Sequence, residues 1–312
     1  MPLADAEHFV RAPNWTWYIL FYFFFAGLSG GSYVLATLLR LRGGRADEAA
    51  ARVGYYLTLP ALLVCPVLLT LDLSQPLRFW HMLVNTTPGQ LAPIFKYWSP
   101  MSVGAWALVV FGGFVAVSFL DAWVRDRRGI DRAGVLAKLW SVVGAVAGLF
   151  IAGYTGVLLS VSNQPVWSDT WVLGGLFLAS GLSGSAALLG WLVRLRKDAR
   201  GRAGAFASSE RFFLFLELVL IVALVVTLIP AGTLGRAFGF PWILLWLVAV
   251  VSLVPWFRSR ERVRPAATGD GAVARDGAVA ARRAIAAPGL LLTLLALVSV
   301  LAIRAAVIFS AQ

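Results

Sequence analysis

Few side chains in this 312-residue chain can carry proton or electron chemistry. The chain has two histidines, His8 and His81, and one cysteine, Cys65. A haem-bearing membrane helix needs an axial ligand inside its apolar run, and neither histidine lies in such a run. One cysteine can form neither an internal disulfide nor a cysteine-ligated cluster. We therefore expect this chain to bind no haem and no metal.

The densest group of polar residues is the segment LDLSQPLRFWH, which supplies Asp72, Arg78 and His81. An imidazole changes its protonation state near neutral pH, so His81 is a candidate proton carrier. A simpler use of His81 is an exposed side chain at the membrane surface. Asp72 equally has a structural use, as a helix cap or as a partner of Arg78.

Four other residues could contribute to a polar site. Asn14 and Tyr18 are four apart and would share one face of a helix. Tyr154 stands between glycines in the sequence GYTG, which leaves room for a ligand ring, although an interfacial aromatic anchor has the same pattern. Glu217 lies inside an apolar run, where a carboxylate is costly and often lines a proton path. It could equally be a protonated glutamate that holds helices together.

The composition places these residues in a membrane. The chain is 60% hydrophobic, has a mean hydropathy of +0.80 and contains only 13% charged residues. Because backbone groups in lipid must be satisfied within one segment, apolar runs of about 20 residues predict spanning helices. The net charge of +12 indicates no nucleic-acid partner, since the basic residues lie in short loops rather than on one stripe. The expected partner of the surface is the lipid bilayer.

The apolar runs predict an all-α integral membrane protein with about eight transmembrane helices, at 15–39, 54–72, 99–121, 135–160, 168–193, 211–232, 240–257 and 288–308. Of the 27 lysines and arginines, 22 fall in four connections, which we expect to be cytoplasmic: 40–53, 122–138, 194–211 and 258–287. Both termini are then extracytoplasmic. Arg304, near the end of the last helix, is expected to extend its side chain to the headgroups.

The sequence also contains an internal similarity. GLSGGS at 27–32 is echoed by GLSGS at 181–185, in two helices that are predicted to run in the same direction. A parallel repeat of two four-helix bundles is therefore expected. The first bundle would comprise residues 1–160 with a polar outer loop at 73–98, and the second residues 161–312 with a flexible cytoplasmic linker at 259–287. Gly27 and Gly31 form a GxxxG pair, which favours close helix packing.

Several segments together resemble the NrfD family, the quinone-interacting membrane subunits of the polysulfide reductase type. They are FFFAGLSGGSYVLA in the first helix, DLSQPLRFWHML followed by SPMSVGAW, GYTGVLLS, and FLASGLSGSAALL. The similarity extends along most of the chain. Family members place a polar pair at the positions of Asn14 and Tyr18, although a histidine would be expected where Tyr18 stands.

The resemblance implies a subunit that is not catalytic alone, located in a bacterial or archaeal cytoplasmic (inner) membrane. It would exchange electrons between a quinone, menaquinone or ubiquinone, and an extracytoplasmic four-cluster, ferredoxin-like iron-sulfur subunit. That partner would pass them to a catalytic subunit, for example of the molybdopterin type. The predicted quinone pocket comprises Asn14, Tyr18, Asp72, Arg78, His81 and Tyr154, with Glu217 on a coupled proton path.

Two other functions remain open. A secondary transporter also has parallel repeats, glycine-rich helices and a buried carboxylate, and its site would lie near the bilayer midplane. A purely structural anchor would tether an extracytoplasmic enzyme without any quinone chemistry. The polar segment at one membrane face favours the quinone subunit.

Overall fold

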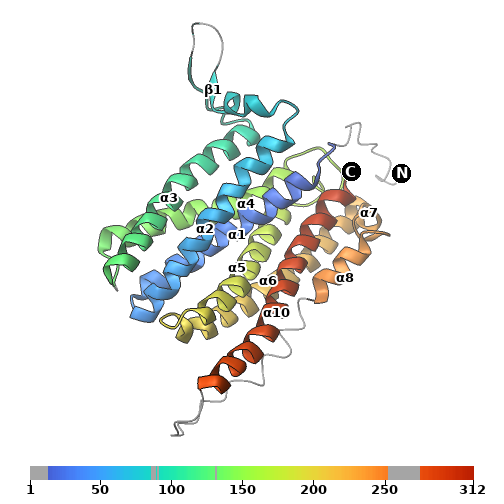
Figure 1. Cartoon of the computed structure of the whole chain (residues 1–312). Coiled ribbons are helices and arrows are strands. Elements are labelled where there is room, and N and C mark those ends of the chain that lie inside the picture. The colour runs from blue at the N-terminus through green and yellow to red at the C-terminus, as the bar shows by residue number, and fades with distance from the viewer. Residues whose placement is uncertain (1–12, 86–88, 90, 131, 252–274) are drawn as a thin grey trace.

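The computed structural model describes residues 13–85, 89, 91–130, 132–251 and 275–312, and it is mainly helical (Figure 1). Seven helices in these residues are long and apolar enough to cross a membrane. They are α1 (Trp17–Arg42), α2 (Arg45–Asp72), α3 (Pro100–Arg128), α4 (Val135–Ser160), α5 (Leu173–Leu195), α6 (Ala203–Ala231) and the apolar part of α10 (Arg275–Ser310). The prediction of an all-α, multi-pass membrane protein is confirmed.

Shorter elements connect these helices. The segment between α2 and α3 contains the 3-10 helix η2 (Pro76–Met82) and two short antiparallel strands, β1 (Val84–Asn85) and β2 (Ala92–Pro93). The 3-10 turn η3 (Arg200–Arg202) precedes α6, and α7 (Leu234–Phe238) precedes α8 (Ile243–Val251). The predicted helix at 240–257 is therefore present as far as Val251, and its remainder lies outside the described residues.

Helix α1 lies in the middle of the molecule and contacts α2, α4, α5 and α10 (Figure 1). It is the most buried of the seven long helices described. Thr16 caps its N-terminus by accepting a hydrogen bond from the Tyr18 amide, at 3.3 Å. Helix α3 begins with Ser99 as its cap and Pro100 in its first turn, a position that suits proline because its missing amide hydrogen is not needed there.

The glycine-rich segments of α1 and α5 lie directly against each other. A Cβ atom added to Gly181 would be 3.0 Å from the Gly27 Cα, and one added to Gly31 would be 2.8 Å from the Gly181 carbonyl oxygen. The Ser185 hydroxyl donates to the Leu28 carbonyl at 3.0 Å across the same crossing. On its other side, Gly30 meets Gly148 of α4, so the glycines permit close packing as predicted.

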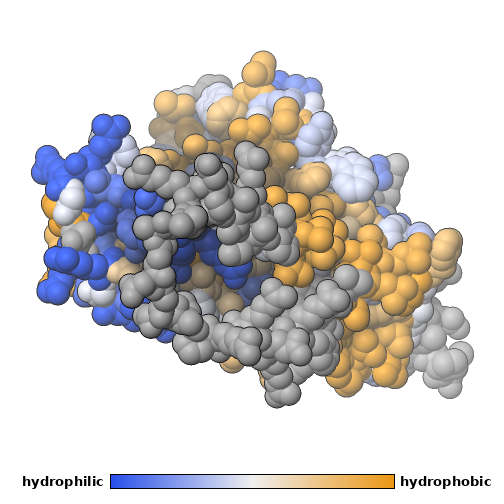
Figure 2. Space-filling view, turned by 60° about the horizontal axis from the view of Figure 1, so that its bottom comes forward, coloured by the Kyte–Doolittle hydropathy of each residue, from blue (hydrophilic) through white to orange (hydrophobic). Residues whose placement is uncertain are grey.

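One end of the molecule, here called the basic end, contains a cluster of buried ion pairs. Arg40 contacts both Glu48 and Asp121 at 3.0 Å, and the side chains of Arg40 and Glu48 are each only 1% exposed. Arg52 pairs with Asp126 at 3.0 Å. In Figure 2, which brings this end forward, hydrophilic residues gather beside a hydrophobic flank.

These ion pairs correct the predicted connection at 40–53. Helix α1 continues to Arg42 and α2 already begins at Arg45, so most of that segment is helical. The charges did not force a loop, because they are neutralised inside the bundle. Asp47 and Glu48 also lie in the first turn of α2, where negative charge is favourable.

The linker predicted at 259–287 also needs correction. Residues 275–287 belong to α10, whereas the preceding part of the predicted linker, up to residue 274, lies outside the described residues. The segment from 275 is rich in alanine and arginine, which have high helix propensity, and it directly precedes an apolar run. A lack of apolar periodicity was therefore insufficient evidence for a linker.

The opposite end, here called the terminal end, joins the two ends of the described chain. The Gln312 side chain accepts a hydrogen bond from the Trp15 amide at 2.8 Å and donates to the Trp15 carbonyl at 3.3 Å. The ring nitrogen of Trp167, which is fully buried, donates to the Val307 carbonyl at 2.7 Å. The terminal end also carries η2 and the β1–β2 hairpin (Figure 1).

Candidate functional site

The polar residues predicted for a quinone pocket lie at the terminal end, and one hydrogen bond joins two of their segments. The Thr16 hydroxyl donates to the Asp72 carboxylate at 3.0 Å, which ties the start of α1 to the end of α2. Thr16 stands between Asn14 and Tyr18, and both of these side chains are exposed. The structure therefore brings Asp72 to the segment that contains Asn14 and Tyr18.

Thr16 was missed in the sequence reasoning. Its signal was available, because a threonine directly before an apolar run is a common helix cap. In the structure Thr16 has two roles, since it caps α1 and also holds Asp72. In the described residues the hydrogen-bond partner of Asp72 is therefore the residue that caps α1, Thr16. The predicted pairing of Asp72 with Arg78 is not found there.

Arg78 and His81 lie on η2, and both side chains are exposed. The His81 ring meets the Trp80 ring edge to face, with 4.2 Å between centroids. Because η2 follows α2 after only three residues, both side chains remain near the terminal end, but no hydrogen bond or ion pair described here joins them to Asp72. In the described residues they are exposed at the terminal end and are not part of a closed pocket.

Tyr154 of α4 is 8% exposed and faces the start of α3. Its hydroxyl donates to the Pro100 carbonyl, and a Cβ atom at Gly104 would lie 2.7 Å from the Tyr154 hydroxyl. Gly104 therefore provides the space that the ring occupies. Near this place the Cys65 thiol of α2 donates a weak hydrogen bond to the Tyr22 carbonyl of α1 at 3.9 Å.

Glu217 is in the middle of α6 and is 3% exposed. One of its carboxylate oxygens accepts a hydrogen bond from the Ser183 hydroxyl of α5 at 2.9 Å. Ser183 belongs to the GLSGS segment, so the second copy of the repeated motif supplies a hydrogen-bond donor for the buried acid. A buried carboxylate in a spanning helix fits either a proton site or a polar clamp between helices.

Arg304 does not extend to the headgroups as predicted, because it is fully buried. Its guanidinium donates to four acceptors contributed by α1, α5 and α10 itself: the carbonyls of Phe23, Phe177 and Val300 and the hydroxyl of Ser180. Gly27 leaves the necessary space, since a Cβ atom there would be 2.6 Å from an Arg304 nitrogen. Sequence position alone could not reveal these acceptors, which come from three helices.

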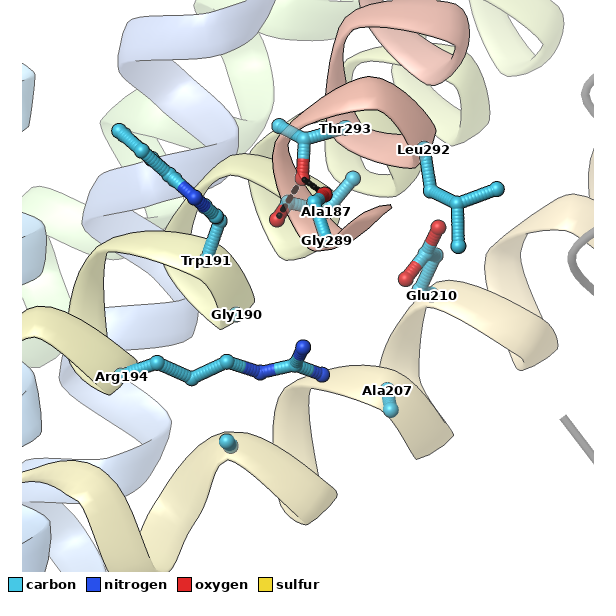
Figure 3. Close-up of a pocket in the computed structure, with 10 residues that line it drawn as sticks. Ala187, Gly190, Trp191, Arg194, Ala207, Glu210, Gly289, Leu292 and Thr293 are labelled. Carbon is cyan, nitrogen blue, oxygen red and sulfur yellow. Dashed lines mark hydrogen bonds between the residues drawn. The ribbon is translucent and has the colours of Figure 1, made fainter. Parts of the chain in front are cut away.

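A cavity of about 90 Å³ lies at the basic end between α5, α6 and α10 (Figure 3). It is lined by Ala187, Gly190, Trp191, Arg194, Ala203, Ala207, Glu210, Gly289, Leu292 and Thr293. The Thr293 hydroxyl is held by the carbonyls of Ala187 and Gly289, at 3.4 and 3.0 Å. Arg194 and Glu210 are the charged residues of this lining, and the sequence reasoning had given them no role.

The comparisons with known proteins concern most of the chain. A family model described as "Polysulphide reductase, NrfD" matches residues 6–290. Protein NrfD of Escherichia coli (strain K12) is 25% identical over 82% of this chain and 86% of that protein. A polysulfide reductase chain of Wolinella succinogenes is 26% identical over 66% of this chain and 69% of that protein.

A third relative is a tetrathionate reductase subunit of Salmonella typhimurium, which is 28% identical over 59% of this chain and 50% of that protein. The matched region of the family model contains the first glycine-rich segment, the Asp72 segment, Tyr154 and Glu217. The family model matches far more than half of the chain, and the described residues contain seven helices that are long and apolar enough to cross a membrane; this multi-pass membrane protein therefore belongs to the NrfD family.

Proposed function

We propose that this chain is the membrane subunit of a reductase complex and exchanges electrons between the quinone pool and an iron-sulfur partner subunit. The family membership carries this proposal, together with relatives that are named as one chain of a polysulfide reductase and one subunit of a tetrathionate reductase. Such names imply further subunits that perform the terminal reaction. An extracytoplasmic, four-cluster iron-sulfur subunit would connect this chain to a catalytic subunit of the molybdopterin type.

The quinone headgroup would bind at the terminal end. A quinone supplies two-electron and two-proton redox chemistry, and its carbonyls need hydrogen-bond donors beside an apolar channel for the tail. The residues there have complementary roles: the exposed Tyr18 hydroxyl can donate to a quinone carbonyl, and the Asp72 carboxylate, held by the Thr16 hydroxyl, can accept the proton of a quinol hydroxyl. Asn14, Arg78 and His81 would complete the polar rim, and Tyr154 would border the site from α4.

The partner subunit would dock on the segment between α2 and α3. This segment lies at the terminal end and exposes large apolar side chains: Leu77, Phe79, Trp80, Met82, Leu91, Phe95, Tyr97 and Trp98. Aromatic residues of this kind are enriched at protein interfaces. The positive-inside rule places the basic end in the cytoplasm of a bacterial or archaeal cell, so the docking surface would be extracytoplasmic.

The proposed function is tested by purifying the complex in mild detergent, extracting quinone and identifying the co-purifying subunits by mass spectrometry. We expect a bound quinone and an iron-sulfur subunit. Asp72→Asn and Tyr154→Phe should lower quinol-linked electron transfer, while electron transfer from an artificial donor directly to the partner subunits should persist. Ser208→Ala, a change at the opposite end of the molecule, is the control.

Each result discriminates between the candidate functions. A protein that purifies alone and without quinone contradicts the proposal and favours a transporter. A complex that contains the partner but transfers no electrons from quinol would instead indicate a purely structural anchor. Loss of electron transfer from both donors in the variants would indicate a disrupted complex rather than a disrupted quinone site.

A further inference from the structure

The starting point is the cavity at the basic end, which is large enough for water. Its volume of about 90 Å³ exceeds the roughly 15 Å³ that one buried water requires. Arg194 and Glu210 are directed into the space between α5, α6 and α10 (Figure 3). Among the residues whose side chains are described, the charged groups around Glu210 are Arg194 on the neighbouring helix and Arg211 on its own helix. The cavity therefore combines a carboxylate with room for water.

Glu210 and Glu217 lie on the same face of α6. Seven residues correspond to about two helical turns, so the two carboxylates are offset by about 10 Å along the helix axis. Glu217 is bonded to Ser183 of α5, and the same helix lines the cavity with Gly190 and Arg194. The cavity and the buried acid therefore lie between the same two helices, α5 and α6, about two helical turns apart.

A buried positive charge stands beyond Glu217. The Arg304 guanidinium donates to the Ser180 hydroxyl at 2.8 Å, and the Ser183 hydroxyl lies 2.9 Å from the Ser180 carbonyl oxygen as well as from Glu217. In the described residues Arg304 and Glu217 are thus linked through Ser180 and Ser183 and not by a direct ion pair. A buried cation at this place lowers the cost of a carboxylate in an apolar interior.

We propose that the cavity at the basic end is the entrance of a proton path in which Glu210 passes protons through water to Glu217. Glu210 releases its proton to a water molecule of the cavity, the Glu217 carboxylate accepts a proton, and the Glu210 carboxylate takes up another from the aqueous phase at the basic end. This rests on the proposed membrane-subunit function and adds to it the side from which protons enter. No redox change occurs in the step.

The proposal is tested by the reaction of dicyclohexylcarbodiimide with Glu217 in native membranes that contain the whole complex. The reagent modifies protonated carboxyl groups in apolar surroundings, and mass spectrometry of the Glu217 peptide measures the modified fraction. Right-side-out and inverted vesicles allow the pH to be changed at one face only. A protease-sensitive tag after Gln312, which lies at the terminal end, identifies the exposed face.

We expect the modified fraction of Glu217 to fall when the pH is raised at the basic end and to stay constant when it is raised at the terminal end. Glu210→Gln should lose most of this response, whereas Glu210→Asp, which keeps the carboxylate, should retain it. Asp198→Asn removes an exposed carboxylate at the same end, outside the cavity. This variant should show the same pH response as the protein without substitutions.

A response to the pH at the terminal end, or an unchanged response in Glu210→Gln, would overturn the proposed path. Quinol-linked electron transfer is measured in the same membranes, so the two proposals fail separately. If electron transfer is present and the pH response follows the wrong face, only the proton path fails. If the expected pH response occurs without quinol-linked electron transfer, the proton path stands and the quinone function fails.

Discussion

At the scale of single residues, the buried charges distinguish this protein from a simple apolar bundle. Arg40 has two acidic partners, Glu48 and Asp121, and its guanidinium also lies 4.4 Å from the centre of the Tyr55 ring. A charged group in this position is stable only while its partners remain ionised and close. Removal of one partner therefore costs more than removal of an exposed charge.

Glu48→Gln should be clearly destabilising. It leaves Arg40 buried with one partner fewer, and breaking a buried pair costs roughly 3–5 kcal/mol in soluble proteins. Asp198→Asn should change the free energy of unfolding by less than about 1 kcal/mol, because the ion pair between Asp198 and Arg196 is partly exposed. Thermal unfolding in detergent compares the two variants. Equal midpoints for Glu48→Gln and Asp198→Asn would contradict the structural role of the cluster.

Arg304→Lys tests whether charge alone is sufficient at that site. An ammonium group has no planar fork, so it cannot reach the carbonyls of Phe23 and Phe177 together. We expect a lower unfolding midpoint although the charge is kept. Arg236→Lys, at an exposed site of α7, is the matched change, since a single hydrogen bond joins Arg236 to the Ser310 carbonyl in the described residues. A larger loss for Arg236→Lys would count against the four-acceptor site.

At the scale of helices, glycine positions decide how closely the elements approach. Helix α1 contacts α5 at Gly27 and α4 at Gly30, so its backbone is close to two neighbours at once. Gly113 of α3, in contrast, has open space where a Cβ atom would be added. The same residue type is therefore essential at one crossing and dispensable at another helix.

Gly30→Ala should separate α1 from α4. Its Cβ atom would be 2.3 Å from the Gly148 carbonyl oxygen, a backbone atom that cannot rotate away. Overpacking of this kind typically costs about 1–3 kcal/mol. Gly113→Ala is the control and should be neutral or slightly stabilising, because alanine favours a helix by about 1 kcal/mol over glycine. Equal unfolding midpoints for the two variants would show that the α1–α4 crossing is absent in the membrane.

At the scale of the whole molecule, the two ends of the described chain meet through Trp15 and Gln312. We therefore expect both termini on one side of the membrane, with the connection between α5 and α6 on the other. Alkaline phosphatase fused after Gln312 should be active in cells, and a fusion at Lys197 should be inactive, if the basic end is cytoplasmic. Green fluorescent protein at the same two positions should give the opposite pattern. Activity at both positions would exclude this topology.

Three features could be predicted from the amino-acid sequence alone: the chain lies in a lipid bilayer, its elements are helices, and it belongs to the NrfD family. Long apolar runs in lipid can only be satisfied as helices, and the recurrent glycine segments predicted close crossings, which the contacts of Gly27 and Gly31 confirm. The predicted quinone residues come from three separate segments that all lie near the same end of the predicted helices, so their presence at one end of the molecule could also be anticipated. Their role in binding stays a prediction.

The contacts between side chains of different helices could not be predicted from the sequence and are known only from the tertiary structure. The acceptors of Arg304 come from three helices, and the partner of Asp72 is 56 positions away in the sequence. Charges at 40–53 looked like a loop because their partners, such as Asp121, belong to a different helix. The sequence shows which polar and charged side chains would be costly to bury. The neighbouring groups that offset this cost depend on how the helices pack. That is why the buried cation and the cavity beside Glu210 appeared only in three dimensions.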